Sequence, residues 1–353
     1  MNTSLKKGTL TSLGTYLLAL VATMVLFKVS MWIPGVLEQL RYTDIWSLVY
    51  NSHRRKASIV LILVLGFYLY TIKKKDSQKA LFGSILYFLP TFSVFLVGMA
   101  LTFTGIEIVA NTVYQTLFDM GIDSNLFLDR LLSRTYYVGE FFFIPYWLYV
   151  ILFWSGEDWY AIFPLRDEFG AFFILLGSLV MFLGVSEWIE GKIMNIGLVR
   201  TGIYRVIRHP QYLGFILWGY GVMVYSTHRQ APFQHPIVPT LNWVLSSLMV
   251  ASVALVEEME LRKSIEEYNE YSENTAFLIP MPRFIRRNLA RSWKKLWNGD
   301  FPSTLRMIGV TLVIIYSLIL LPGLLYGNIY RYEDFIELGK TIDFYEILSG
   351  LGF

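Results

Sequence analysis

Long apolar segments alternate with short polar connections along the whole chain. A helix that crosses a bilayer needs about 20 apolar residues, with a range of about 17–25, and about eight segments approach that length. These segments are Leu10–Ile33, Ser58–Ile72, Leu81–Phe103, Tyr136–Trp154, Phe169–Trp188, Tyr212–Tyr225, Leu241–Val256 and Leu305–Tyr326. The pattern therefore predicts an all-α fold, a polytopic integral membrane bundle of about eight transmembrane helices.

Composition supports a membrane protein and excludes several other classes. Of the 353 residues, 55% are hydrophobic and 16% are charged, whereas soluble domains carry about 25% charged residues. The net charge of +3 is too small to indicate nucleic-acid binding. The chain has no cysteine, which excludes disulfides, thiolate metal ligands and a cysteine nucleophile. Lys6 and Lys7 precede the first apolar segment, as in a signal peptide. However, this segment is long for a signal peptide and does not end in a small-residue cleavage site, so we expect a membrane anchor.

Two of the connections are predicted to lie on the membrane surface. The region 107–134 is too polar to cross a bilayer and should form surface helices. Pro282–Lys295 is rich in arginine and lysine and carries apolar residues, including Trp293, at helical spacing. A basic amphipathic helix of this kind lies flat on an anionic membrane face.

Span order gives a partial topology and a division into three regions. It places two polar stretches, Thr201–Gly214 and Glu257–Leu261, on the same side as the basic segment, and the positive-inside rule makes that side cytoplasmic. Counting spans backwards places Lys73–Lys75 on the opposite side, so either one N-terminal span is misassigned or that hairpin is re-entrant. We expect an N-terminal transmembrane region of unknown role at 1–135, a core with both polar stretches at 136–282, and a basic interfacial helix, last transmembrane helix and tail at 283–353.

The stretch Thr201–Gly214, TGIYRVIRHPQYLG, concentrates hydrogen-bond donors between two apolar segments. Proline suits the first turn of a helix but not its interior, so Pro210 is predicted to start the helix that continues through Tyr212. Arg208 and His209 then lie at a helix N-terminus, where free N–H groups and the helix dipole favour an anion. The expected guest is a carboxylate or a phosphate.

The second stretch places Glu257 and Glu258 next to each other at the end of an apolar segment. Such a pair could bind a hydroxyl pair such as a ribose, a cationic ammonium or sulfonium group, or a metal. Only His209 offers a nearby nitrogen ligand, so we expect no metal site. Tyr268 and Tyr271, farther along, are typical of anchors at the membrane interface, unless they form the roof of the pocket.

These stretches resemble a known pair of motifs. Leu198–Gly214 resembles the signature of the isoprenylcysteine carboxyl methyltransferase and phospholipid methyltransferase superfamily, roughly L-V-x-x-G-x-Y-R-x-x-R-H-P-x-Y-x-G. The partner signature, E-E-x-x-L followed by spaced tyrosines, is similar to Glu257–Leu261 with Tyr268 and Tyr271. The resemblance covers roughly Phe169–Pro282.

The resemblance implies an integral membrane methyltransferase that uses S-adenosylmethionine at the cytoplasmic face. Its acceptor would be a lipid or a lipid-modified molecule, either an isoprenylcysteine carboxylate or a phospholipid amine, that arrives from the lipid side. By this resemblance the cofactor-binding residues are Tyr204, His209, Tyr212, Gly214, Glu257 and Glu258, and the catalytic residues are Glu258 and Arg208.

Two acceptor chemistries and two other functions remain open. An amine acceptor must lose a proton, for which Glu258 is the candidate base, whereas a carboxylate needs only a cation such as Arg208 or Arg205 to orient it. The main alternative is a membrane reductase of the sterol reductase type, which uses NADPH and resembles this superfamily in its C-terminal helices. A transporter or scaffold is the third possibility, and it predicts no cofactor binding.

Overall fold

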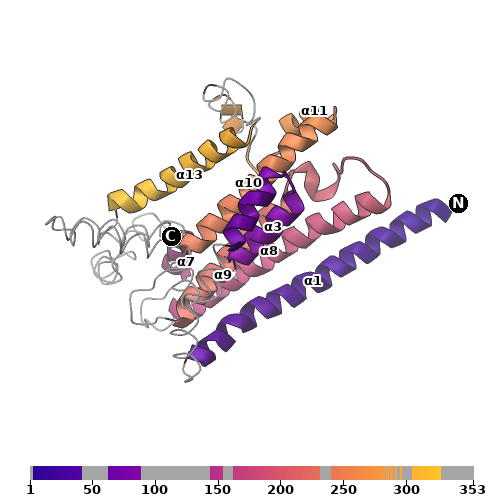
Figure 1. The fold of residues 1–353 in the computed structure, drawn as a ribbon. Coiled ribbons are helices and arrows are strands. Elements are labelled where there is room, and N and C mark those ends of the chain that lie inside the picture. Colours follow the sequence, from indigo (N-terminus) through magenta and orange to yellow (C-terminus); the bar gives the residue numbers. More distant parts are fainter. Residues whose placement is uncertain are drawn as a thin grey trace, which may run out of the picture.

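The computed structural model describes residues 3–41, 63–88, 144–153, 162–230, 240–282 and 304–326, with isolated residues between 284 and 295. Within these ranges the chain is helical apart from turns and an isolated parallel bridge between Ile207 and Ala276, so the all-α prediction is confirmed for them (Figure 1). The labelled elements are α1 (Thr3–Arg41), α3 (Ser77–Phe88), α7 (Ile144–Phe153), α8 (Ile162–Ile193), η4 (Gly202–Arg205), α9 (Pro210–Gln230), α10 (Thr240–Ser264), α11 (Tyr268–Asn274) and α13 (Leu305–Tyr326).

Among the described residues, two helices are long and apolar enough to cross a membrane. These spans, Ser12–Val36 in α1 and Asp167–Ile193 in α8, agree with the first and fifth apolar segments of the sequence. Leu63–Lys73 and Leu305–Ile319 form shorter apolar helices. The larger count of about eight transmembrane helices stays a prediction, as do the boundaries of the three regions.

Glycines bring the backbones of α8 and α9 together. A Cβ atom on Gly177 would lie 2.1 Å from the backbone nitrogen of Trp218, and one on Gly214 would lie 2.3 Å from the backbone nitrogen of Met181. Only a hydrogen atom fits at either position, and small residues of this kind allow helices to approach closely. The start of α9 is therefore fixed against α8.

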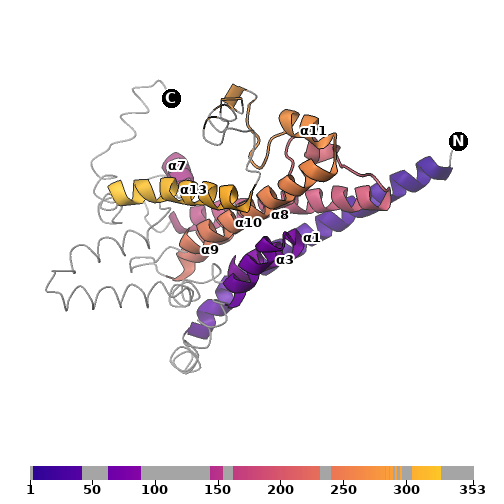
Figure 2. The same ribbon diagram turned by 45° about the horizontal axis from the view of Figure 1, so that its top comes forward.

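Aromatic side chains join α3 and α10 to this pair. Phe88 of α3 packs against Phe215 and Trp218 of α9, with ring centroids 5.2 and 4.9 Å apart. The indole of Trp243 on α10 donates a hydrogen bond to the carbonyl oxygen of Ile216 at 3.0 Å. These contacts place α10 beside α9 (Figure 2). The hydrogen bond from Tyr212 near the start of α9 to Glu257 near the end of α10 brings these two ends together.

Polar contacts show which segments share the end of the bundle that carries the signature. Ser12 of α1 donates a hydrogen bond to the carboxylate of Glu190 at the end of α8. Lys75 Nζ lies 2.9 Å from Oε1 of Glu260, near the end of α10. The first part of α1 and the turn at Lys73–Lys75 therefore lie at the signature end. The placement of Lys73–Lys75 on the opposite side, obtained by counting spans, is wrong.

Several sequence predictions fall outside the described residues. They concern the surface helices at 107–134, the segment around Pro90 and the first part of the predicted span Tyr136–Trp154. Most of the predicted basic surface helix after Pro282 also lies outside them.

Candidate functional site

The signature stretch begins after α8 and is fixed by short backbone contacts. α9 starts at Pro210, as its sequence predicts. Just before it, the N–H of Arg208 donates to the carbonyl of Ala276 at 2.9 Å, and the N–H of Ala276 donates to the carbonyl of Val206 at 3.2 Å. This parallel bridge joins the signature to the segment that follows α11.

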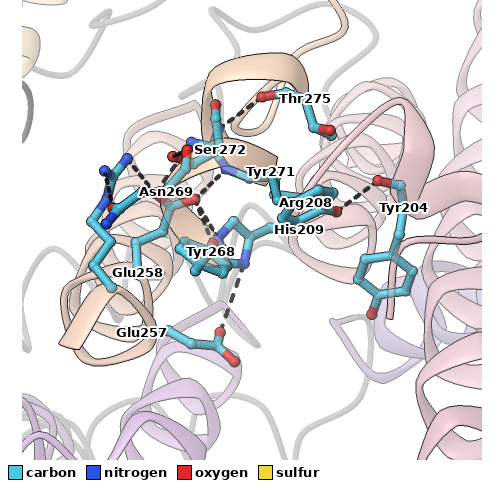
Figure 3. A network of polar contacts seen from close by, with 11 residues as sticks. Tyr204, Arg208, His209, Glu257, Glu258, Tyr268, Asn269, Tyr271, Ser272 and Thr275 are labelled. Atoms are coloured by element: carbon cyan, nitrogen blue, oxygen red, sulfur yellow. Dashed lines mark hydrogen bonds and ion pairs between the residues drawn. The ribbon is translucent and has the colours of Figure 1, made fainter. Parts of the chain in front are cut away.

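Arg208 and Glu258 form a buried ion pair at the centre of the site (Figure 3). Arg208 Nε lies 2.5 Å from Glu258 Oε1, and Nη2 lies 3.2 Å from Oε2, so the guanidinium meets the carboxylate through two bonds. Arg208 Nη1 also donates to the backbone carbonyls of Ser272 and Thr275, the latter at 2.7 Å. The side chains of the pair are 7% and 0% exposed. The anion that Arg208 meets is therefore a carboxylate of its own chain.

Three further side chains surround the Glu258 carboxylate, among them Arg262, whose Nη2 lies 3.7 Å from Oε2. His209 Nε2 lies 3.2 Å from Oε1, and the hydroxyl of Tyr268 donates to the same oxygen at 3.0 Å. Burial acts to raise the pKa of Glu258, but the hydrogen bond from His209 and the charge of Arg208 outweigh it and lower the pKa to about 2. A carboxylate with so low a pKa is a weak base at neutral pH. Its environment thus favours a positioning role over proton removal.

Glu257 has a different environment from its neighbour. Its side chain is 37% exposed. Tyr212 donates a hydrogen bond to Glu257 Oε2 at 2.8 Å, and His209 Nδ1 lies 3.7 Å from the same atom. The rings of His209 and Tyr212 stack with their centroids 5.4 Å apart and an interplanar angle of 15°. Glu257 is therefore a partly exposed carboxylate beside two aromatic rings.

Two buried tyrosines connect η4 with the elements around it. The Tyr204 hydroxyl has two acceptors within reach of its single hydrogen, the carbonyl of Gly184 at 3.2 Å and Gln211 Oε1 at 3.1 Å. The hydroxyl of Tyr271 donates to the carbonyl of Tyr204 at 2.6 Å. Burial raises the pKa of Tyr204 and of Tyr271, so both hydroxyls stay protonated and act as donors.

The structure brings most of the predicted site residues together. Arg208, His209, Glu257 and Glu258 form one cluster, and Tyr204 joins it through Tyr271 (Figure 3). Tyr212 joins the cluster through its hydrogen bond to Glu257. That these residues contact a cofactor stays a prediction.

Other side chains lie where the sequence does not place them. Gly214 faces the backbone of Met181 on α8, so the structure gives it a packing role, and its contact with a cofactor stays a prediction. Tyr268 and Tyr271 are buried in the site, so their interpretation as interface anchors is wrong. Arg205 is exposed. Arg200 pairs with Glu267 on the surface.

Sequence reasoning missed three kinds of contributor. Glu187, in the last turns of α8, accepts hydrogen bonds from the backbone of η4. Its signal is a carboxylate within an apolar segment, where a charge is costly unless it is paired. Phe277 packs its edge against the His209 ring at 5.3 Å. The carbonyls of Ser272 and Thr275 leave no signal, because every residue carries one.

Comparison with known proteins gives a limited result. Residues 190–275 match the family described as "Protein of unknown function (DUF1295)", which is related to steroid 5-alpha reductase-like membrane proteins. The match covers about a quarter of the chain and includes both polar stretches. No curated protein and no solved structure matches the chain. Among the described residues, no three His, Asp or Glu side chains group as a metal site.

Proposed function

We propose that this chain is an integral membrane methyltransferase that transfers a methyl group from S-adenosylmethionine to a lipid or lipid-modified acceptor. The observation that carries the proposal is Glu257, a partly exposed carboxylate beside the His209 and Tyr212 rings in a cluster built from both signature stretches. S-adenosylmethionine carries a sulfonium and an ammonium group. A carboxylate and aromatic faces are the groups that attract such cations.

In this proposal the buried side chains hold the site together, and the partly exposed Glu257 binds the cofactor. The pair of Arg208 and Glu258 joins the start of α9 to the end of α10, and the bond from Tyr268 adds α11. Glu257 then holds the cationic cofactor at a fixed place on this frame. A carboxylate that stabilises the sulfonium before reaction strengthens binding but does not by itself accelerate the transfer.

The transfer is an in-line displacement at the methyl carbon. A lone pair of the acceptor forms the new bond to carbon while the carbon–sulfur bond breaks, and the sulfonium becomes a neutral thioether. The protein contributes mainly by holding donor and acceptor in line, which can supply about 7–11 kcal/mol of the barrier. If the acceptor is an amine, a base must take its proton. The sequence suggests Glu258 as this base. Glu257 is the better candidate, because its side chain is partly exposed, whereas that of Glu258 is fully buried.

Exposed apolar surface supports a membrane location and a lipid acceptor. Leu13 and Leu17 on α1 and Leu318 on α13 are exposed large apolar residues, and a bilayer would cover such surfaces. The site lies at the same end of the bundle as the lysines of Lys73–Lys75. By the positive-inside rule we place that end, with the active site, on the cytoplasmic face.

A reductase that uses NADPH is the second candidate, and the family match favours it. The family that matches residues 190–275 is related to steroid 5-alpha reductase-like proteins. However, the phosphates of NADPH are anionic and would be repelled by the exposed carboxylate of Glu257. We therefore prefer the methyltransferase.

Titration of both cofactors against the purified protein separates the candidates. S-adenosylmethionine should bind the wild type, and Glu257→Gln should weaken its binding by about tenfold, the effect of losing one charge-assisted contact. Glu260→Gln is the matched control, because Glu260 lies on the same helix, is 46% exposed and pairs with Lys75 away from the cluster. Binding of NADPH without binding of S-adenosylmethionine would overturn the methyltransferase proposal and favour the reductase.

A further inference from the structure

A third glutamate, which the proposed reaction does not use, holds the entry of the signature stretch. Glu187 lies in the last turns of α8 and is buried. Both of its carboxylate oxygens lie 3.1 Å from the backbone nitrogen of Ile203, whose N–H they accept. Charge-assisted hydrogen bonds of this kind are about twice as strong as neutral ones. Glu187 also lies before the residues matched by the family, 190–275.

The backbone at this point is shaped to meet that carboxylate. Gly202 has a φ of +50°, a conformation that residues with a side chain rarely adopt. A Cβ atom on Gly202 would lie 1.8 Å from Glu187 Oε1. The glycine therefore lets the chain turn and lets the carboxylate approach the first N–H groups of η4.

The turn η4 contacts the site, and Glu187, which holds η4, contacts α1. Tyr204, which follows Ile203, accepts the hydrogen bond from Tyr271 of α11. On the opposite side, the hydroxyl of Tyr16 on α1 lies 3.4 Å from Glu187 Oε1. Glu187 thus connects a helix outside the signature resemblance to the loop that carries Arg208.

We propose that Glu187 is a positioning residue of the candidate cofactor site, which fixes the Gly202–Arg205 turn and through it the arrangement of Arg208 and His209. This inference rests on the proposed function for its effect on the cofactor, but not for its effect on the turn. Glu187 does not touch the cofactor in this account. It acts through the backbone of η4.

The test uses hydrogen exchange of the Ile203 amide in the full-length protein together with the dissociation constant for S-adenosylmethionine. Glu187→Ala should accelerate exchange at Ile203 by about tenfold, the loss of one hydrogen bond to a charged group, and should weaken cofactor binding. Glu187→Gln keeps an acceptor oxygen and should restore most of both properties. Glu190→Ala is the matched control, because Glu190 is one turn away on α8 and contacts Ser12 rather than η4.

The outcomes separate this inference from the proposed function. Wild-type exchange and wild-type affinity in Glu187→Ala would overturn the inference. Equal effects of Glu187→Ala and Glu190→Ala would also overturn it, because they would show only a general loosening of α8. If the wild type binds no S-adenosylmethionine, the proposed function fails, and the exchange of Ile203 still decides whether Glu187 holds the turn. If Glu187→Ala does not fold, Gly202→Ala provides the second variant and should show the same faster exchange.

Discussion

Two arginine–glutamate pairs in this protein have the same closest distance but different surroundings. Arg208 and Glu258 meet at 2.5 Å with side chains that are 7% and 0% exposed. Arg200 and Glu267 also meet at 2.5 Å, but they lie in contact with solvent. Water screens the second pair, whereas loss of Arg208 from the first removes the main cationic partner of a buried carboxylate. The buried pair should therefore matter far more to folding.

This contrast gives the first prediction. Arg208→Ala should lower the free energy of unfolding by about 3–5 kcal/mol. Arg200→Ala should lower it by about 0–1 kcal/mol. Denaturant unfolding of both variants in the same detergent provides the measurement. Equal losses would show that Glu258 is not buried with Arg208 as described.

The lowered pKa of Glu258 gives a prediction for acid stability. The folded-state pKa, about 2, lies below the ordinary glutamate value of 4.5, so this carboxylate stabilises the fold above the unfolded-state pKa and loses that effect as the pH falls toward about 2. The stability difference between the wild type and Glu258→Gln should therefore be largest near neutral pH and shrink below about pH 4.5. Thermal unfolding of the two proteins across this range measures it. A difference that does not change with pH would contradict the assignment.

At the scale of the helices, the seam between α8 and α9 sets the position of the site. Gly177 and Gly214 lie on opposite sides of this seam, and neither has room for a Cβ atom. The packing density of such an interface equals that of a crystal of small organic molecules, so an added methyl group forces the helices apart. The start of α9, with Arg208 and His209, would move with them.

The α8–α9 seam is tested by comparing Gly177→Ala, which adds a methyl group inside it, with Gly309→Ala, which adds one where there is open space. A Cβ atom on Gly177 would meet the Trp218 backbone at 2.1 Å, whereas one on Gly309 of α13 meets nothing within 4 Å. Gly177→Ala should cost about 1–3 kcal/mol of stability through overpacking. Gly309→Ala should be neutral or stabilising by up to about 1 kcal/mol through helix propensity. Equal melting temperatures for the two variants would argue against the seam.

At the scale of the whole molecule, the segments around the site lie at one end of the bundle. The ion pair between Lys75 and Glu260 and the contact of Ser12 with Glu190 fix this arrangement without reference to a membrane. At the other end, Tyr149 of α7 donates to Glu168 of α8 at 3.2 Å. A bilayer around the bundle would therefore separate Glu168 from Lys75 and Glu260.

Single cysteines test this topology, since the chain has none of its own. Lys74→Cys and Glu266→Cys should react with a membrane-impermeant maleimide only after the membrane is opened. Glu168→Cys should react in intact cells. Labelling of Lys74→Cys and Glu266→Cys from opposite sides would contradict the structure, and labelling of both from outside would contradict the cytoplasmic assignment.

Sequence alone predicts the elements of the site well, because they follow from local rules. Pro210 starts α9, since proline tolerates only the first turn of a helix, and the last apolar segment is α13 with the predicted bounds Leu305–Tyr326. The meeting of the two polar stretches also follows, because a helix hairpin returns the chain to the same end.

The distribution of roles within the site could not be predicted. Glu257 and Glu258 are identical and adjacent, and only the rotation of α10 decides which one is buried beside Arg208. Tyrosines near the end of an apolar segment are typical of interface anchors, and nothing local shows that Tyr268 and Tyr271 are buried. These features depend on tertiary packing.

The most direct test of the account is methyl transfer from S-adenosylmethionine labelled in its methyl group. The purified protein should transfer label into a total lipid extract or into prenylcysteine analogues. Glu257→Gln should reduce the transfer at limiting cofactor by about tenfold, whereas Glu260→Gln should not change it. Absence of transfer to every acceptor by a protein that remains folded, or transfer that Glu257→Gln leaves unchanged, would contradict the proposed site.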